Sequence, residues 1–105
     1  MRTEDMQILK RFAERVRGRF PDAEVWAFGS RARGDAGSDS DLDICVVLPE
    51  LDRRKDEEIL DVAWEVGFEA DVVISTVTFS EADFTRGPCA ASPLVEEIRE
   101  NGVAA

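Results

Sequence analysis

Apolar residues recur at helical spacing over several segments of the chain. This spacing predicts helices over residues 3–19 and 53–65, the second of them capped by Gly67. A final helix is predicted from Ser92-Pro93 to Asn101-Gly102, because proline suits the first helical position. Ser80 to Asp83 is typical of a capping box and predicts a further short helix.

Strand-like apolar runs lie between these helices. They predict three strands, over residues 24–29, 41–48 and 70–75, with a continuation of the third to Phe79 left open. A short helix over residues 31–33 follows the first strand, with Ser30 as its N-cap, and residues 34–40 form a loop. We therefore expect an α/β (α+β) fold, a small mixed β-sheet flanked by helices, in one domain of 105 residues.

Composition excludes several functional classes. The chain has 13 basic and 23 acidic residues and a net charge of -10, so we expect no direct nucleic-acid binding. It has no histidine, which excludes His-based triads and nearly all zinc sites. No apolar run approaches the roughly 20 residues of a membrane span, and no signal peptide is visible. Cys45 and Cys89 lack CxxC spacing, which favours reduced thiols and a cytoplasmic location.

Charge is distributed unevenly along the chain. Residues 1–33 contain eight basic and five acidic residues, whereas residues 34–105 contain five basic and eighteen acidic ones. A site that combines arginines with clustered carboxylates could bind a metal-bound polyphosphate. The simpler alternative is a solvated surface on which charge is unevenly distributed.

Asp41 and Asp43 are candidate metal ligands. They are two residues apart on a predicted strand, so both side chains project from one face, while Leu42 and Ile44 face the core. Two carboxylates roughly 5 Å apart repel by about 3 kcal/mol at an effective dielectric near 20. A cation between them would offset this repulsion, and a site with oxygen ligands only indicates Mg²⁺ or Mn²⁺. The alternative is a pair of exposed charges at a strand end.

Gly29-Ser30 precedes this pair, at the end of the first strand. A glycine lets a phosphate approach the backbone closely, and the free N–H groups of a helix start face outward. Arg31 and Arg33 lie in the first turn of the short helix, where an anionic ligand would offset their unfavourable interaction with the helix dipole. A simple turn is the alternative.

Asp71 is the candidate third carboxylate. If it begins the third strand beside the second, it lies within reach of Asp41 and Asp43. Three converging carboxylates suit a two-metal site for in-line displacement at phosphorus. A surface residue at a strand start is the alternative. Trp26, Trp64 and Cys45 are expected in the core.

The spacing of Gly29-Ser30, ten residues and Asp41-x-Asp43 resembles the signature of DNA polymerase β-type nucleotidyltransferases. The string GSRARGDAGSDSDLDI resembles the minimal nucleotidyltransferase (MNT) family, and the similarity covers most of the chain. The resemblance implies that Asp41, Asp43 and Asp71 are catalytic and bind two Mg²⁺ ions. Gly29 and Ser30 would then hold the phosphates of ATP. We add Arg33 as a phosphate contact and interpret Asp39 as a turn residue.

Small MNT proteins resemble the antitoxin half of HEPN/MNT toxin–antitoxin pairs. The resemblance implies transfer of AMP from ATP to a tyrosine hydroxyl of a HEPN ribonuclease toxin, within a hetero-oligomer. The chain has no room for an acceptor-binding domain, so a partner could form the other wall of the site. Two alternatives remain: an antitoxin that neutralises by binding alone, and a nucleotidyltransferase that acts on a small molecule or RNA.

Overall fold

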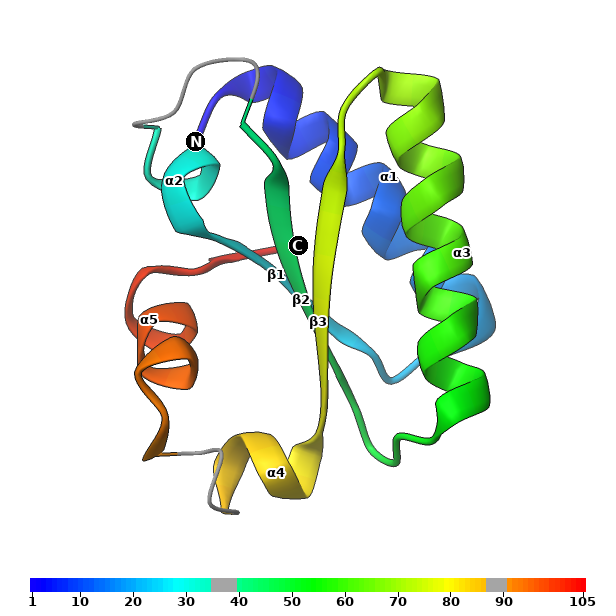
Figure 1. The fold of residues 1–105 in the computed structure, drawn as a ribbon, viewed down its shortest axis with the longest axis vertical. Helices are drawn as coiled ribbons and strands as arrows, with labels where there is room; N and C mark the ends of the chain where they lie inside the picture. The colour runs from blue at the N-terminus through cyan, green and yellow to red at the C-terminus, as the bar shows by residue number, and fades with distance from the viewer. Residues whose placement is uncertain (35–39, 87–90) are drawn as a thin grey trace.

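A computed structural model describes residues 1–34, 40–86 and 91–105 of the chain (Figure 1). The elements in chain order are α1 (Thr3–Arg19), β1 (Glu24–Phe28), α2 (Gly29–Arg33), β2 (Leu42–Leu48), α3 (Arg53–Ala70), β3 (Ile74–Ser80), α4 (Glu81–Thr85), α5 (Pro93–Asn101) and β4 (Val103–Ala104). In the described part of the chain, no helix has the length and apolarity needed to cross a membrane.

The strands form one mixed sheet in the order β3-β2-β1-β4. β1 pairs antiparallel with β2 and with β4, and β2 pairs parallel with β3 through the α3 crossover. The predicted mixed sheet flanked by helices is thus confirmed. The two-residue β4 was not predicted, because so short a strand carries no periodic signal.

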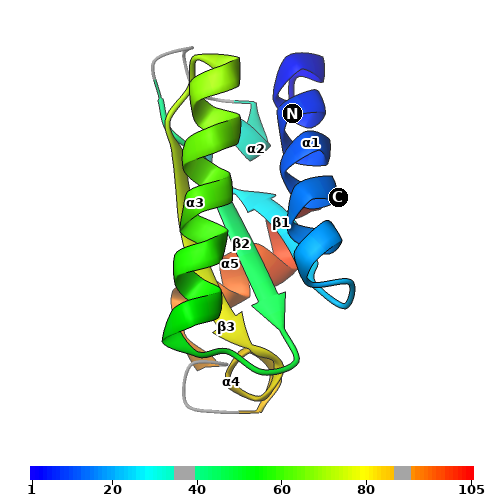
Figure 2. The same cartoon turned by 90° about the vertical axis from the view of Figure 1, so that its right-hand side faces the viewer.

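Helices cover both faces of the sheet. α1 and α3 lie side by side on one face (Figure 2), where Phe12 and Ile59 pack against Leu42 and Ile44. On the other face, Phe84 of α4 and the α5 residues Val95 and Ile98 pack against Cys45 and Val47. β2 is therefore buried on both sides along most of its length, and Cys45 is a core residue as expected.

The end of α3 differs from the prediction. The helix continues past Gly67 to Ala70, and its C-cap is Asp71 in the left-handed conformation, with φ 56°. Gly67 instead lies inside the helix, where the chain folds back past it. A glycine is needed there because an added Cβ would lie 2.6 Å from the Val72 carbonyl oxygen. β3 accordingly begins at Ile74, four residues later than predicted.

Most of the basic N-terminal segment is used within the fold. Arg15 donates two hydrogen bonds of 2.7 Å to the Glu69 carboxylate and lies 3.9 Å from Glu65. Hydrogen bonding from Arg15 lowers the pKa of Glu69 below its ordinary value. Arg11 and Arg19 form further ion pairs with α3. The arginines of α1 therefore neutralise the adjoining side of α3.

Helix N-caps agree with the sequence at two of three positions. The Ser80 and Ser92 hydroxyls accept hydrogen bonds from the backbone N–H of Asp83 and Val95, as expected of N-caps. Ser30, predicted as a third N-cap, lies inside α2, which begins at Gly29.

Candidate functional site

Asp41 and Asp43 lie at the N-terminal end of β2. Asp41 immediately precedes the strand and is exposed, and Asp43 is partly buried, while Leu42 between them is fully buried. Burial raises the pKa of Asp43, and the negative charge of Asp41 raises it further. The pair therefore favours binding of a proton or a cation.

Gly29 lies directly against Asp43. Its φ is +77°, and an added Cβ would lie 2.5 Å from Oδ2 of Asp43. Phe28, the residue before the turn, pairs with Asp43 across the β1–β2 ladder. Only glycine, which lacks a Cβ, therefore fits at this position beside the Asp43 carboxylate. Ser30 follows in the first turn of α2.

The two arginines of α2 have different environments. Arg31 is buried and donates a 2.9 Å hydrogen bond to Asp5 of α1, so the expectation that it serves a bound anion was wrong. Arg33 is exposed, and its Nη1 lies 3.1 Å from Oε1 of Glu97 on α5. Arg33 would have to exchange this partner to contact a phosphate.

Asp71 lies outside the sheet that carries Asp41 and Asp43. It caps α3, the register of β2 with β3 places Ser75 level with Asp43, and the Val73 carbonyl oxygen accepts a 2.9 Å hydrogen bond from the Leu42 N–H. Among residues 1–34, 40–86 and 91–105, no group of three or more His, Cys, Asp or Glu residues is arranged to hold a metal ion. The structure therefore does not bring the three predicted carboxylates into one cluster. Of the three predicted carboxylates, Asp41 and Asp43 are close in sequence and offer oxygen ligands suited to a divalent cation.

Asp41 and Asp71 do line the same cavity. This cavity of about 850 Å³ lies between α3 and β3 and is open to solvent. Its apolar lining includes Trp64 and Phe68, which are 73% and 88% exposed. The expectation of a core Trp64 was wrong. Leu60, Trp64 and Phe68 recur every four residues beside the buried Ile59 stripe, and this second stripe was the missed sequence signal.

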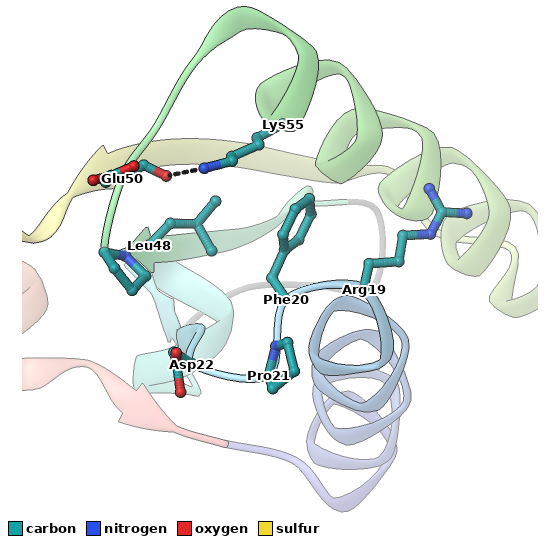
Figure 3. Close-up of a pocket in the computed structure, with 8 residues that line it drawn as sticks. Arg19, Phe20, Pro21, Asp22, Leu48, Glu50 and Lys55 are labelled. Carbon is teal, nitrogen blue, oxygen red and sulfur yellow. Dashed lines mark hydrogen bonds between the residues drawn. The ribbon is translucent and has the colours of Figure 1, made fainter.

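A second cavity of about 260 Å³ lies at the opposite end of β2, beside Leu48 (Figure 3). Phe20 and Pro21 line it, and Lys55 donates a 3.2 Å hydrogen bond to the Glu50 carbonyl oxygen. The seven residues of β2 separate this cavity from Asp41, so it does not belong to the candidate site. Asp39 and Cys89, also considered from the sequence, lie outside the described residues.

Comparison with known proteins agrees with the geometry. Residues 9–104 match the family described as "Nucleotidyltransferase domain". The chain is 26% identical over 103 residues to MJ0141 of Methanocaldococcus jannaschii, which is named as a candidate protein adenylyltransferase. That alignment covers 95% of this chain and 97% of the relative.

Solved structures share the fold at low sequence identity. A toxin–antitoxin complex with AMP-PNP matches with a TM-score of 0.63 and 20% identity, over 90% of this chain and 69% of that one. A tri-AMPylated Shewanella oneidensis HEPN toxin in complex with an MNT antitoxin matches with a TM-score of 0.58 and 17% identity, over 95% and 70%.

Proposed function

Because the chain belongs to the nucleotidyltransferase domain family, we propose that it transfers AMP from ATP to a tyrosine hydroxyl of a partner HEPN ribonuclease toxin and thereby acts as its antitoxin. The observation that carries this proposal is the contact between the Gly29 backbone and Asp43, with Asp41 two residues away at the rim of an open cavity. A triphosphate can approach from the turn, and an acceptor can approach from the cavity.

The similar proteins support this choice of reaction. The name of the M. jannaschii relative specifies protein adenylyltransfer. One structural neighbour was crystallised with AMP-PNP, an ATP analogue, and another contains a tri-AMPylated HEPN toxin beside its MNT antitoxin.

In the reaction, the acceptor oxygen bonds to the α-phosphorus of ATP while the bond from that phosphorus to the pyrophosphate oxygen breaks. The proton of the hydroxyl passes to Asp71 or to a water beside it. Asp41 and Asp43 would hold Mg²⁺, which when bound supplies positive charge to the triphosphate. The backbone of Gly29, the Ser30 hydroxyl and Arg33 would bind phosphate oxygens. Asp71 is proposed as the third metal-binding carboxylate, which requires it to approach Asp41 and Asp43 more closely than its place as the α3 cap allows here.

The test incubates the chain with α-labelled ATP, Mg²⁺ and the product of the neighbouring gene, the candidate HEPN partner. We expect label on the HEPN protein and its loss in Asp41→Asn and Asp43→Asn. Label that persists in both variants would refute the proposal, as would absence of label with the unaltered chain. Transfer to an added small molecule or RNA instead would indicate a different acceptor class.

The position of Asp71 favours one alternative, an antitoxin that neutralises by binding alone. As a helix cap outside any three-carboxylate group, Asp71 does not complete a two-metal site in this structure. This alternative predicts inhibition of the HEPN protein without label, unchanged in Asp41→Asn and Asp43→Asn.

A further inference from the structure

We propose that the cavity between α3 and β3 is the docking groove for the acceptor protein, and that its partner segment presents apolar side chains flanked by Lys or Arg. We call it the α3–β3 groove. Leu60, Trp64 and Phe68 of α3 line it, together with Val73, and Asp41 and Asp71 lie on its wall. This inference rests on the proposed function, since it identifies where the acceptor binds.

The apolar side chains of the groove are exposed to an unusual degree. Phe68, Trp64 and Val73 are each more than 60% exposed, and Leu60 is 48% exposed. Four large apolar side chains gathered on one solvated surface indicate a protein interaction site rather than scattered surface residues. Aromatic residues also contribute disproportionately to the free energy of protein binding.

The groove is continuous with the candidate active site. Asp41 lines it, and Asp41 is two residues from Asp43, the carboxylate that lies against Gly29. An acceptor bound against Trp64 and Phe68 would therefore extend toward the position where ATP is held. This continuity favours the acceptor protein over a partner that acts at a distance from the site.

Charge identifies the chemistry of the acceptor segment. Arginines of α1 pair with the α3 carboxylates on the side away from the groove, such as Glu69 and Glu65. Asp61 lies one turn from Trp64 on the same helix and forms no ion pair with any described residue, whereas Asp41 and Asp71 are assigned to the proposed metal site. The Asp61 carboxylate and the net acidity of the chain favour a basic partner. They disfavour a second copy of this chain, whose net charge is -10.

Trp64 reports on docking without any need for catalysis. The chain has only two tryptophans, and Trp26 packs edge-on against Phe84 on the other face of the sheet. We expect the proposed HEPN partner to shift Trp64 emission to shorter wavelength and to protect it from acrylamide, with ATP absent. In Trp64→Phe, where Trp26 alone emits, the shift should disappear.

Steady-state kinetics of AMP transfer provides a second test of the groove. The double variant Trp64→Ser/Phe68→Ser should raise KM for the HEPN protein at least tenfold, while KM for ATP stays unchanged. Leu94→Ser is the matched control, because Leu94 is an exposed apolar residue on α5, on the opposite face of the sheet. It should leave both constants unchanged.

The outcomes separate this inference from the proposed function. Unchanged Trp64 emission, or an unchanged KM for the HEPN protein in the double variant, would overturn the docking groove even where AMP transfer occurs. Quenching of Trp64 by ATP with a raised KM for ATP would assign the groove to the nucleobase and overturn it as well. Emission that shifts with the HEPN protein in the absence of any transfer would support the groove and refute the proposed reaction.

Discussion

Asp43 combines partial burial with a neighbouring negative charge. Both effects raise its pKa above its ordinary value of 3.8, and burial is the larger. A carboxylate whose pKa is raised by folding stabilises the folded state below its unfolded pKa. That contribution is lost as pH rises through the folded pKa. At neutral pH and without metal, the ionised Asp43 is therefore unfavourable for folding.

We accordingly expect Asp43→Asn to fold normally and to be as stable as the unaltered chain, or slightly more so, at pH 7 without Mg²⁺. The stability advantage of the variant should be absent below pH 3.8 and should grow as pH rises through the folded pKa of Asp43. Urea unfolding of both proteins across this range in EDTA would measure it. A clear loss of metal-free stability in the variant at pH 7 would contradict this account of the site.

Asp71 has two separable properties, its backbone conformation and its charge. Its φ of 56° is one that glycine adopts freely and asparagine tolerates. Asp71→Gly should therefore raise the free energy of unfolding by up to about 1 kcal/mol, and Asp71→Asn should change it little. If Asp71 assists the acceptor hydroxyl, both variants should lose AMP transfer by about 10² or more. Unimpaired transfer in both would leave Asp71 as a helix cap only.

At the scale of elements, the junction of β1 and α2 depends on Gly29. Gly29→Ala places a Cβ within 2.5 Å of the Asp43 carboxylate at a φ of +77°. We expect a loss of about 2 kcal/mol or more in unfolding free energy, together with loss of ATP binding. Gly18→Ala is the control, because nothing lies within 4 Å of its added Cβ inside α1. It should gain roughly 0.5–1 kcal/mol by helix propensity. Equal stability of the two variants would show that the contact with Asp43 is unimportant.

The elements that follow from local rules were predictable from the sequence. α1, β1, β2 and α5 depend on apolar periodicity and on caps such as Ser92, and their predicted bounds agree closely with the structure. The end of α3 was not predictable, because the sequence does not distinguish between two structural roles of a glycine such as Gly67. A glycine can end a helix or can admit a close backbone contact, and only the approach of the Val72 carbonyl decides between them.

The candidate site was predictable only in part, because local spacing along the chain places some of its residues and not others. Phe28 pairs with Asp43 across one antiparallel ladder, and Gly29 and Asp41 are close to that pair along the chain, so the sequence was sufficient to place them together. The prediction for Asp71 depended on where β3 begins. Because β3 begins at Ile74, Ser75 pairs with Asp43 and Asp71 lies before the strand. The partners of Arg31 and Arg33 come from distant helices, Asp5 of α1 and Glu97 of α5, which periodicity does not place.

At the scale of the whole molecule, the negative charge is organised by the fold. The arginines of α1 neutralise carboxylates on the adjoining side of α3, whereas Asp41 and Asp71 line the groove on its other side. A strongly acidic surface accelerates encounter with a basic partner, and salt screens this effect. Apolar side chains in a groove act instead on the dissociation rate, once water has been displaced.

These two contributions can be separated in the kinetics of association with the HEPN protein. Stopped-flow measurement of Trp64 emission should give an association rate constant that falls at least tenfold from about 0.01 M to about 1 M NaCl, because the Debye length shrinks from about 30 to about 3 Å.

Asp61→Asn should lower the association rate at low salt more than Glu100→Gln does. The two variants have the same net charge, but Glu100 lies on α5 on the other face of the sheet. Phe68→Ser should instead raise the dissociation rate. Equal effects of the two charge variants would mean that the acidic surface steers the partner only through total charge, and the groove would then have no part in its approach.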